Sequence, residues 1–292
     1  MAIAGVPQAQ VGIIGGSGFY EMEGFTDGQE VRVDTPFGPP SDTLTVGRLG
    51  DVPLAFLPRH GRGHRIIPTE LPARANIYAL KSLGVERVIA VSAVGSMKEQ
   101  IRPLDLVVPD QLMDRTKSRP STFFGDGLAA HVSFADPFCP HLSTALVDAA
   151  SQVGARVHAG GTYVCIEGPQ FSTRAESRIY RQWGVDVIGM TALPEAKLAR
   201  EAELCYASLA LATDYDVWHE SEAEVTVEMV VSNLLKNVET SKKVVGAAVA
   251  ALPGERTCAC PAALRDAIIT QRDRIPGAAR LRLDLLVGKY LQ

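Results

Sequence analysis

The segment spanning residues 184–216 restricts the fold more than any other part of this 292-residue chain. Val185–Ile188 is a short apolar run typical of a buried strand, and Tyr206–Ala212 is a second run of the same kind. Between them, Pro194–Glu203 is rich in Ala, Glu, Lys, Leu and Arg and has proline in its first turn, which predicts a helix. Strand, helix and strand in this order predict a right-handed parallel βαβ unit.

Polar residues follow each of the two predicted strands. Met190-Thr191 comes after the first strand, and Asp214 and Asp216 come after the second. Ligands of open α/β sheets bind beyond the carboxyl ends of the strands, so these residues are candidates for a binding site. Two carboxylates there can bind N–H donors or act as acid and base. A turn with helix-capping Asp residues is the simpler alternative, and the other strand ends of the chain decide between the two.

Composition narrows the class of protein. The apolar share of 46% supplies enough material for one large α/β domain or two small ones. The net charge of −4 argues against nucleic acid or an anionic membrane as the main partner. No apolar run approaches the roughly 18 residues that span a bilayer. The first ten residues lack a basic stretch and an apolar signal core, so we expect a cytoplasmic enzyme.

A glycine-rich turn follows the first predicted strand, Val11–Ile14. The turn Gly15-Gly16-Ser17-Gly18 fits neither the dinucleotide fingerprint nor a Walker A loop. It still exposes backbone N–H groups and the Ser17 hydroxyl, which suit a phosphate. A plain tight turn is the alternative.

A basic loop follows a predicted hairpin formed by Thr43–Leu49 and Pro53–Leu57. Residues 58–65, PRHGRGHR, place two histidines and three arginines among glycines directly after the second strand. Arginine offers a fork for phosphate oxygens, and glycine allows a close approach, so we favour an anion site at Arg59 and His60 over a flexible solvated loop.

The remaining elements are predicted from periodicity and end signals. Ser172 or Thr173 should cap a helix that carries Glu176 in its first turn. The long polar loop 114–131 is typical of a functional or subunit-contact segment. Further strands are predicted at 87–92, 106–109 and 162–166, and helices at 76–83, 141–153, 175–183, 226–251, 262–274 and 281–291.

The five cysteines do not have the spacing of a zinc site, so we expect no metal. Cys165 and Cys205 lie in apolar runs and should be buried thiols. Cys139 and Cys205 can pair if the fold brings them together. Cys258-Ala259-Cys260 can form a strained, labile disulfide, although two free thiols are the more natural interpretation.

Four strand ends thus carry Ser17, Arg59-His60, Ser92-Ala93 and Met190-Thr191, and a fifth carries the two Asp residues. This pattern resembles the trimeric purine nucleoside phosphorylase family. The resemblance extends from about Val11 to Leu252, in order and with the family's spacing. It rests on the segments VGIIGGSG, DTPFGPPSD, RHGRGH, ARANIYALKSLG, DRT, PFCP, IEGPQFSTRAES and ATDYDVW.

The resemblance implies a single α/β domain over residues 1–292, with a mixed sheet wrapped by helices and a helical C-terminal extension at 261–292 near a subunit interface. It implies a homotrimer or a dimer of trimers, and reversible phosphorolysis of a purine nucleoside to the free base and a ribose 1-phosphate. Inorganic phosphate is then a co-substrate, and no cofactor is needed.

The resemblance also implies roles for individual residues. Phosphate is expected at Ser17, Arg59, His60, Ser92, Ala93 and Thr191; the ribose at Met190; the base at Phe171, Ser172, Asp214 and Asp216; and the 5′ substituent at His64, Val227 and His131, the last from an adjoining subunit. Ala93 is also expected to contact the nucleoside.

The residue types fit that chemistry. Cleavage passes through an oxocarbenium-like ribosyl cation, which an oriented phosphate anion both attacks and stabilises. We expect Asp214 to be the catalytic acid at purine N7 and Asp216 to face the 6-amino group. A carboxylate there favours adenine over a 6-oxopurine, because a carbonyl would meet lone pairs. Val227 and the absence of an expected carboxylate at the 5′ end favour a methylthio group, and hence methylthioadenosine.

Three alternatives stay open. A 6-oxopurine or methylthioinosine phosphorylase would keep the fold and the phosphate site. A hydrolase that uses water is disfavoured by the number of residues assigned to phosphate. A non-catalytic nucleoside-binding or scaffold protein remains an alternative, because fold does not determine function.

Overall fold

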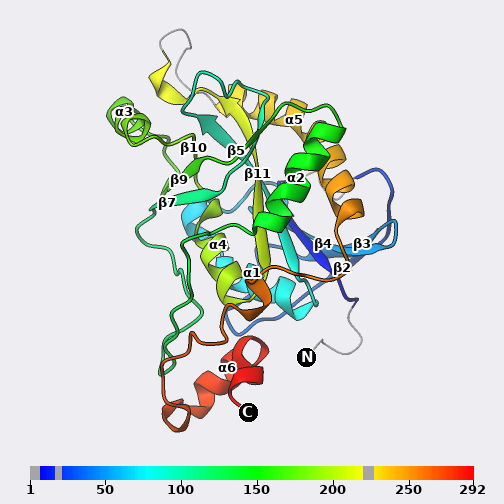
Figure 1. Cartoon of the computed structure of the whole chain (residues 1–292), viewed down its shortest axis with the longest axis vertical. Coiled ribbons are helices and arrows are strands. Elements are labelled where there is room, and N and C mark those ends of the chain that lie inside the picture. Colours follow the sequence, from blue (N-terminus) through cyan, green and yellow to red (C-terminus); the bar gives the residue numbers. More distant parts are fainter. Residues whose placement is uncertain (1–6, 17–21, 220–226) are drawn as a thin grey trace.

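Strand β5 (Arg87–Ser96) is the centre of one mixed sheet, which has eleven strands in the described part of the chain. The computed structural model describes residues 7–16, 22–219 and 227–292 (Figure 1). The other strands are β1 (Val11–Gly15), β2 (Phe25–Val31), β3 (Leu44–Leu49), β4 (Val52–Pro58), β6 (Leu106–Val108), β7 (Gln111–Arg115), β8 (Val157–Ala159), β9 (Thr162–Ile166), β10 (Val187–Gly189) and β11 (Cys205–Asp214).

The helices connect these strands across both faces of the sheet. The α-helices are α1 (Ala73–Ser82), α2 (Pro140–Gln152), α3 (Arg174–Gln182), α4 (Ala192–Glu201), α5 (Val227–Ala251) and α6 (Gly277–Val287). Short 3-10 turns are η2 (Pro68–Glu70), η3 (Asp216–Trp218), η4 (Cys260–Ala262), η5 (Arg272–Arg274) and η6 (Gly288–Tyr290).

Three strands pair with β5. Along one edge, β1 pairs in parallel with residues 87–90, and β10 pairs in antiparallel fashion with residues 95 and 96. Along the other edge, β11 runs parallel to β5 over its whole length. The sheet continues from β1 through β4, β3 and β2, from β10 through β9 and β7, and from β11 through β6 and β8.

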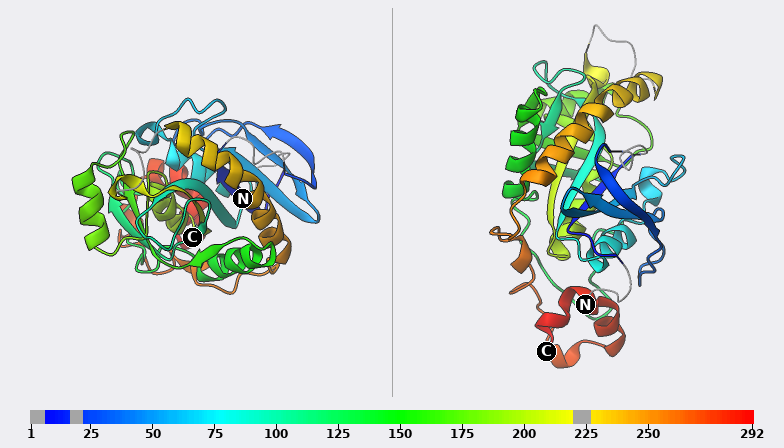
Figure 2. Two further views of the ribbon diagram at one scale, coloured as in Figure 1. Left: turned by 90° about the horizontal axis from the view of Figure 1, so that it is seen from above. Right: turned by 90° about the vertical axis from the view of Figure 1, so that its right-hand side faces the viewer.

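The core lies in two layers, one on each face of the sheet. Alternate residues of a strand point to opposite faces, so Ile14, Ala90 and Ala210 pack toward α1 and α4, whereas Ile13 and Leu209 pack toward α2 and α5. Figure 2 shows the helices around the sheet and the C-terminal segment extending beyond one end of the body. The predicted single α/β domain with a mixed sheet, surrounding helices and a helical C-terminal segment is confirmed.

The predicted parallel βαβ unit is wrong. Because β10 is antiparallel to β5 and β11 is parallel to it, the strands before and after α4 run in opposite directions. The reason is the length of β5: residues 91–96 extend beyond the part that pairs with β1, and the three-residue β10 pairs in reverse with the last two of them. Sequence identifies the two strands and the helix but not the edge on which each strand pairs.

The helix predicted at 262–274 is also wrong, and the last helix begins earlier than predicted, at Gly277 instead of Leu281. The backbone of 262–274 forms separate turns with i to i−3 bonds, such as those from Ala263 to Cys260 and from Ala267 to Leu264. Between these turns, the N–H of Leu264 donates to the Glu203 carboxylate at 3.0 Å, and that of Ile269 to the Ala129 carbonyl. Isolated turns and tertiary bonds thus take the place of the continuous i to i−4 ladder of a helix.

The other predicted elements are confirmed, with ends shifted by a few residues. Thr173 caps α3 in a capping box with Glu176, as expected. Within the described residues, no helix combines the length and apolarity needed to cross a membrane.

Candidate active site

The site forms where the edge of β5 is open. Residues 91–94 pair with β11 on one side, but on the other side neither β1 nor β10 reaches them in the described part of the chain. The Val91 carbonyl accepts a hydrogen bond from Arg59 Nη1 at 2.8 Å across this edge. Alternate residues of a strand direct their backbone groups to the same edge, so the backbone of Ala93 also faces the opening.

Arg59 follows β4 and lies almost wholly buried, with 2% exposure. Its Nε and Nη2 donate to the two Glu195 carboxylate oxygens at 2.6 and 3.1 Å, a bidentate ion pair. Burial opposes the guanidinium charge, but the attraction of Glu195 outweighs it, so the pKa of Arg59 is raised. The pair fixes a permanent cation at the open edge of β5.

His60 is neutral at physiological pH, because burial lowers its pKa to about 4. Its Nδ1 lies 2.8 Å from the Ile66 carbonyl, which can only accept, so Nδ1 carries the proton and Nε2 carries a lone pair. The His64 ring stacks on that of His60, with centroids 4.2 Å apart. His64 itself adopts a positive φ of 54° in the glycine-rich turn.

Thr191 lies next to Ser92 because β10 runs antiparallel to β5. Val187 faces Ser96 and Ile188 faces Gly95, so the residues after β10 continue alongside 92–94. Thr191 is buried at the start of α4, and its hydroxyl does not cap that helix. The hydroxyl is therefore available to the open edge.

The Tyr163 hydroxyl lies beside the Ser92 and Thr191 side chains. It is buried and has no hydrogen bond of acceptable geometry within the described residues. Burial raises its pKa to about 12, so it is a neutral donor at physiological pH. Gly189 makes room for it, since an added Cβ there would overlap the hydroxyl oxygen.

Met190 is held between two loops. Gly168, at a positive φ of 65°, packs so closely that an added Cβ would lie 2.5 Å from Met190 Sδ. Arg119, from the long loop after β7, donates to the carbonyls of Met190 at 2.5 Å, Leu193 at 2.7 Å and Glu167 at 2.5 Å. This arginine joins the end of β9 to the turn before α4.

Asp214 ends β11 and is buried. Its Oδ1 accepts from the backbone N–H of Asp216 at 2.8 Å, and its Oδ2 accepts from the Thr213 hydroxyl at 2.7 Å. Gly95 lies opposite Asp214 in the register of β5 and β11. The two bonds fix the carboxylate at the open end of the sheet.

Asp216, the first residue of η3, bonds through its carboxylate to α3 and to the residues just before it. Both carboxylate oxygens accept from the Ser172 hydroxyl at 2.9 Å, and Oδ2 also accepts from Ser177 at 2.6 Å. Burial raises the pKa of Asp216, and these hydrogen bonds partly offset the rise. Phe171, next to Ser172, is 45% exposed.

The structure brings most of the predicted residues together at this end of the sheet. Arg59, His60, Ser92, Ala93, Thr191 and Met190 border the open edge of β5, Asp214, Asp216 and Ser172 lie at the end of β11, and His64 stacks on His60. Ser17 lies outside the described residues.

Two further predicted residues lie outside this buried group. Val227 begins α5 and is 68% exposed, and the same helix bonds to the end of β11 through Asn233, which donates to the Thr213 carbonyl at 2.7 Å. His131 is exposed beside the C-terminal segment, where its N–H donates to the Ala267 carbonyl. That segment is at the opposite end of the molecule from Asp214, so a single chain does not bring His131 to the site (Figure 1).

Comparison with known proteins agrees with this geometry. The family model of the phosphorylase superfamily matches residues 10–250. The chain belongs to the phosphorylase superfamily. A Koribacter versatilis protein named S-methyl-5′-thioadenosine phosphorylase is 59% identical over 283 residues, 97% of each chain. A Geobacter sulfurreducens protein of the same name is 56% identical over 282 residues, 96% of this chain and 99% of the other.

Solved phosphorylase structures share the fold. A methylthioadenosine phosphorylase from an antarctic soil metagenomic library superimposes with a TM-score of 0.92 at 50% identity, covering 96% of this chain and 99% of the other. The Schistosoma mansoni methylthioadenosine phosphorylase in complex with adenine gives 0.81 at 42% identity, covering 85% and 93%. The predicted resemblance to purine nucleoside phosphorylases is confirmed.

Sequence reasoning missed several residues that shape this phosphorylase site. Glu195, Arg119 and Ser177 each hold a predicted site residue in place, yet they lie far from it in sequence. The only local signal was weak: Ser177 follows the Thr173 cap by one helical turn, on the side that faces the strand ends. Nothing in the sequence pairs Arg59 with Glu195, 136 positions later.

Proposed function

We propose that this chain catalyses the reversible phosphorolysis of S-methyl-5′-thioadenosine to adenine and 5-methylthioribose 1-phosphate. The observation that carries the proposal is the pair of buried carboxylates, Asp214 and Asp216, beside an open strand edge that holds the cation of Arg59. The names of the relatives and the adenine in the Schistosoma mansoni complex support the same activity.

Phosphate would lie on the open edge of β5. Four hydrogen bonds from Arg59 engage four of its five N–H groups, which leaves one N–H to donate to an anion. The hydroxyls of Ser17, Ser92 and Thr191 and the backbone of Ala93 would supply further contacts. The lone pair on His60 Nε2 suits a P–OH group, so the neutral ring would accept a hydrogen bond from the bound phosphate.

The ribose would lie over Met190, between the phosphate and the base. As the glycosidic bond breaks, positive charge develops at C1′ and electron density moves onto the purine. The phosphate anion would face the positive charge at C1′ and stabilise it. Asp214 would donate a proton to N7 and so neutralise the electron density that moves onto the purine. Asp216, held by Ser172 and Ser177, would accept a hydrogen bond from the 6-amino group.

The 5′ pocket would be completed by a second copy of the chain. His64 and Val227 would provide two of its walls, and His131 of a neighbouring subunit would provide a third, because His131 is exposed and remote within its own chain. A homotrimer or a dimer of trimers would satisfy this requirement. The reaction would use inorganic phosphate as co-substrate and no other cofactor.

Base release from three nucleosides tests the proposal. Methylthioadenosine, adenosine and methylthioinosine are each incubated with the purified chain, with and without inorganic phosphate, and the released base is quantified. We expect adenine release that requires phosphate, matches the phosphate consumed and is fastest from methylthioadenosine.

The other outcomes separate the alternatives. Release only from methylthioinosine would keep the phosphate site and overturn the roles of Asp214 and Asp216. Release without phosphate would indicate a hydrolase. No release from any nucleoside, with binding retained, would favour a nucleoside-binding protein.

A further inference from the structure

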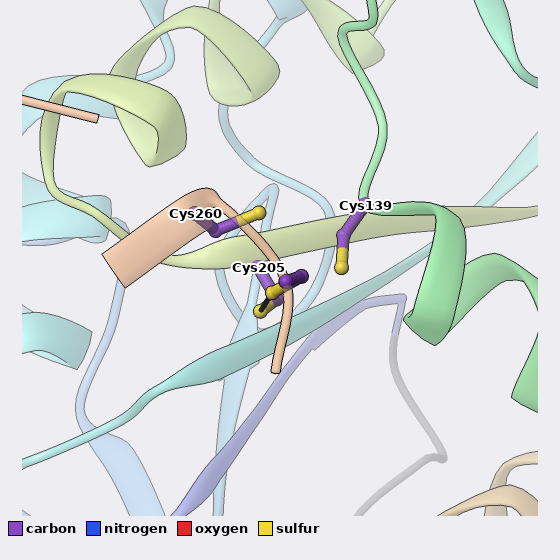
Figure 3. A group of neighbouring side chains, drawn as sticks. Cys139, Cys205 and Cys260 are labelled. Carbon is purple, nitrogen blue, oxygen red and sulfur yellow. Dashed lines mark hydrogen bonds between the residues drawn. The ribbon is translucent and has the colours of Figure 1, made fainter. Parts of the chain in front are cut away.

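Four of the five cysteines form one cluster, although they come from three separate parts of the chain. Cys139 precedes α2, Cys205 begins β11 and Cys260 begins η4, as Figure 3 shows, and Cys258 lies two residues before Cys260. The four sulfur atoms lie within 4.8 Å of one another, and three of the four residues are buried. All four are free thiols in the structure.

We infer that this cluster is a structural zinc site with four thiolate ligands. Cysteine thiolates are preferred ligands of Zn²⁺, and a site closed by four protein ligands is typical of a structural role. Spacing along the chain does not show the site, because Cys139 and Cys205 are 66 positions apart (205 − 139). The fold alone assembles the ligand set.

The geometry fits a tetrahedral ion. With Zn–S bonds of about 2.3 Å, the sulfur atoms of a tetrahedron are about 3.8 Å apart. The sulfur atoms of Cys205 and Cys258 lie 3.4 Å apart, and no two sulfur atoms of the cluster are more than 4.8 Å apart. A disulfide would need about 2.05 Å. The sulfur atoms are thus spaced for a shared ion, with only small shifts needed to close around it.

The side chains around the cysteine cluster suit the negative charge that a zinc-loaded site would carry. Binding exchanges four S–H protons for one Zn²⁺ and leaves a centre of net charge −2. Arg87 and Arg256 line the cavity that also borders Cys139, Cys205 and Cys258. Their orientation is set by other groups: Arg87 donates to the Pro253 carbonyl at 2.7 Å and Arg256 to the Glu203 carbonyl at 2.9 Å. The two arginines share a single carboxylate, that of Glu86, at 3.4 and 3.5 Å, so Glu86 balances only one of their two positive charges, and the other favours an anionic centre.

The ion would fasten the C-terminal segment to the sheet. Residues after α5 pass through Cys258 and Cys260 before Leu264 and α6 pack against the core. Cys205 and Asp214 are the two ends of β11, roughly 30 Å apart at about 3.3 Å per residue. The centre is therefore distant from the candidate active site, and this inference does not rest on the proposed function.

The test is the metal content of the full chain. The protein is purified without a metal-binding tag from cells grown with zinc, and bound metals are quantified by atomic emission. We expect about one zinc per chain in the wild type. The double variant Cys258→Ser/Cys260→Ser should contain none, and Cys165→Ser should keep its zinc because Cys165 lies outside the cluster.

Two further measurements keep the test decisive if the double variant fails to fold. Wild-type protein that is reduced, stripped of metal and refilled with Co²⁺ should show the intense charge-transfer absorption of a tetrahedral thiolate centre. Removal of zinc should lower the thermal midpoint of the wild type. A folded wild type that is metal-free and takes up no Co²⁺ after reduction would overturn the inference. Two disulfides among the four cysteines in unreduced protein, seen by peptide mapping, would overturn it equally.

Discussion

Gly95 of β5 lies directly opposite Asp214 of β11, and a Cβ added at Gly95 would lie 3.0 Å from Asp214 Oδ1. The same Cβ would lie 3.0 Å from Ile188 on the other side of the strand. The missing side chain thus leaves the space in which the buried carboxylate takes its orientation. The absence of a side chain at Gly95 therefore sets the orientation of Asp214, the proposed acid.

Gly95→Ala should therefore lower kcat while leaving the fold intact. Its φ is ordinary, so alanine is compatible with the backbone, and the added methyl group acts by displacing the side chains it meets, those of Asp214, Ile188 and Asp216. A displacement near 1 Å corresponds to a loss of about 100-fold in kcat. Steady-state kinetics with methylthioadenosine measures it. Gly254→Ala is the control, because nothing lies within 4 Å of the added Cβ; equal rates in both variants would contradict the role of this space.

Glu195→Gln should destabilise the protein strongly. The substitution removes the negative charge that compensates the guanidinium of Arg59, and water cannot solvate that guanidinium because it is buried. Breaking one partner of a buried pair typically costs about 3–5 kcal/mol. Urea unfolding measures the free energy, and the KM for phosphate should rise as the guanidinium loses its fixed orientation.

The matched control for this variant is Glu30→Gln, which breaks the exposed ion pair between Glu30 and Arg62. Because that pair is solvated, its loss should cost less than about 1 kcal/mol. Similar losses in the two variants would show that burial does not govern the Arg59 pair.

Sequence predicts the local elements of this fold well. The hairpin β3–β4 follows from two apolar runs around Gly50-Asp51, and the α3 capping box follows from Thr173 and Glu176. Each depends on neighbouring residues only. The strand ends that carry polar residues are equally visible, which is why most of the candidate site could be anticipated.

Strand direction and tertiary pairing are not local properties. β10 pairs antiparallel to β5 because β5 extends beyond the residues that pair with β1. That difference in length emerges only when the sheet is assembled. The helix expected at 262–274 does not form, and two backbone N–H groups of this segment bond instead to Glu203 and Ala129, which are distant in sequence. The four-cysteine cluster was hidden for the same reason.

Asp216→Asn should move substrate preference from adenine toward 6-oxopurines. The asparagine amide can donate to a 6-oxo group, whereas the carboxylate can only accept from a 6-amino group. Ser172 and Ser177 would hold the new side chain in a similar place, because their hydroxyls can donate or accept. The ratio of kcat/KM for methylthioadenosine to that for methylthioinosine should fall by about 10-fold or more. Asp51→Asn, at the exposed hairpin turn, should leave the ratio unchanged; an unchanged ratio in Asp216→Asn would remove the 6-position contact.

Glu201 makes the stability of the protein depend on pH. Burial raises the pKa of Glu201 from 4.5 to about 6, although the Phe123 N–H and the Thr122 hydroxyl both donate to it at 2.7 Å. Between these two pH values the folded state holds a proton that the unfolded state has lost. The contribution of Glu201 is therefore fully present below about pH 4.5 and is lost as pH rises through about 6, a loss of about 2 kcal/mol.

Glu201→Gln should abolish this loss, because the amide keeps an acceptor for the Phe123 N–H and carries no charge. The free energy of unfolding of the variant minus that of the wild type should increase by about 2 kcal/mol between pH 4.5 and 7.5. Urea unfolding at both pH values measures it. Burial lowers the pKa of His60 to about 4, so His60 makes stability rise with pH over the same range in both proteins. Subtracting the free energy of the wild type from that of the variant removes this shared effect. A difference that is constant with pH would mean that folding does not raise the pKa of Glu201.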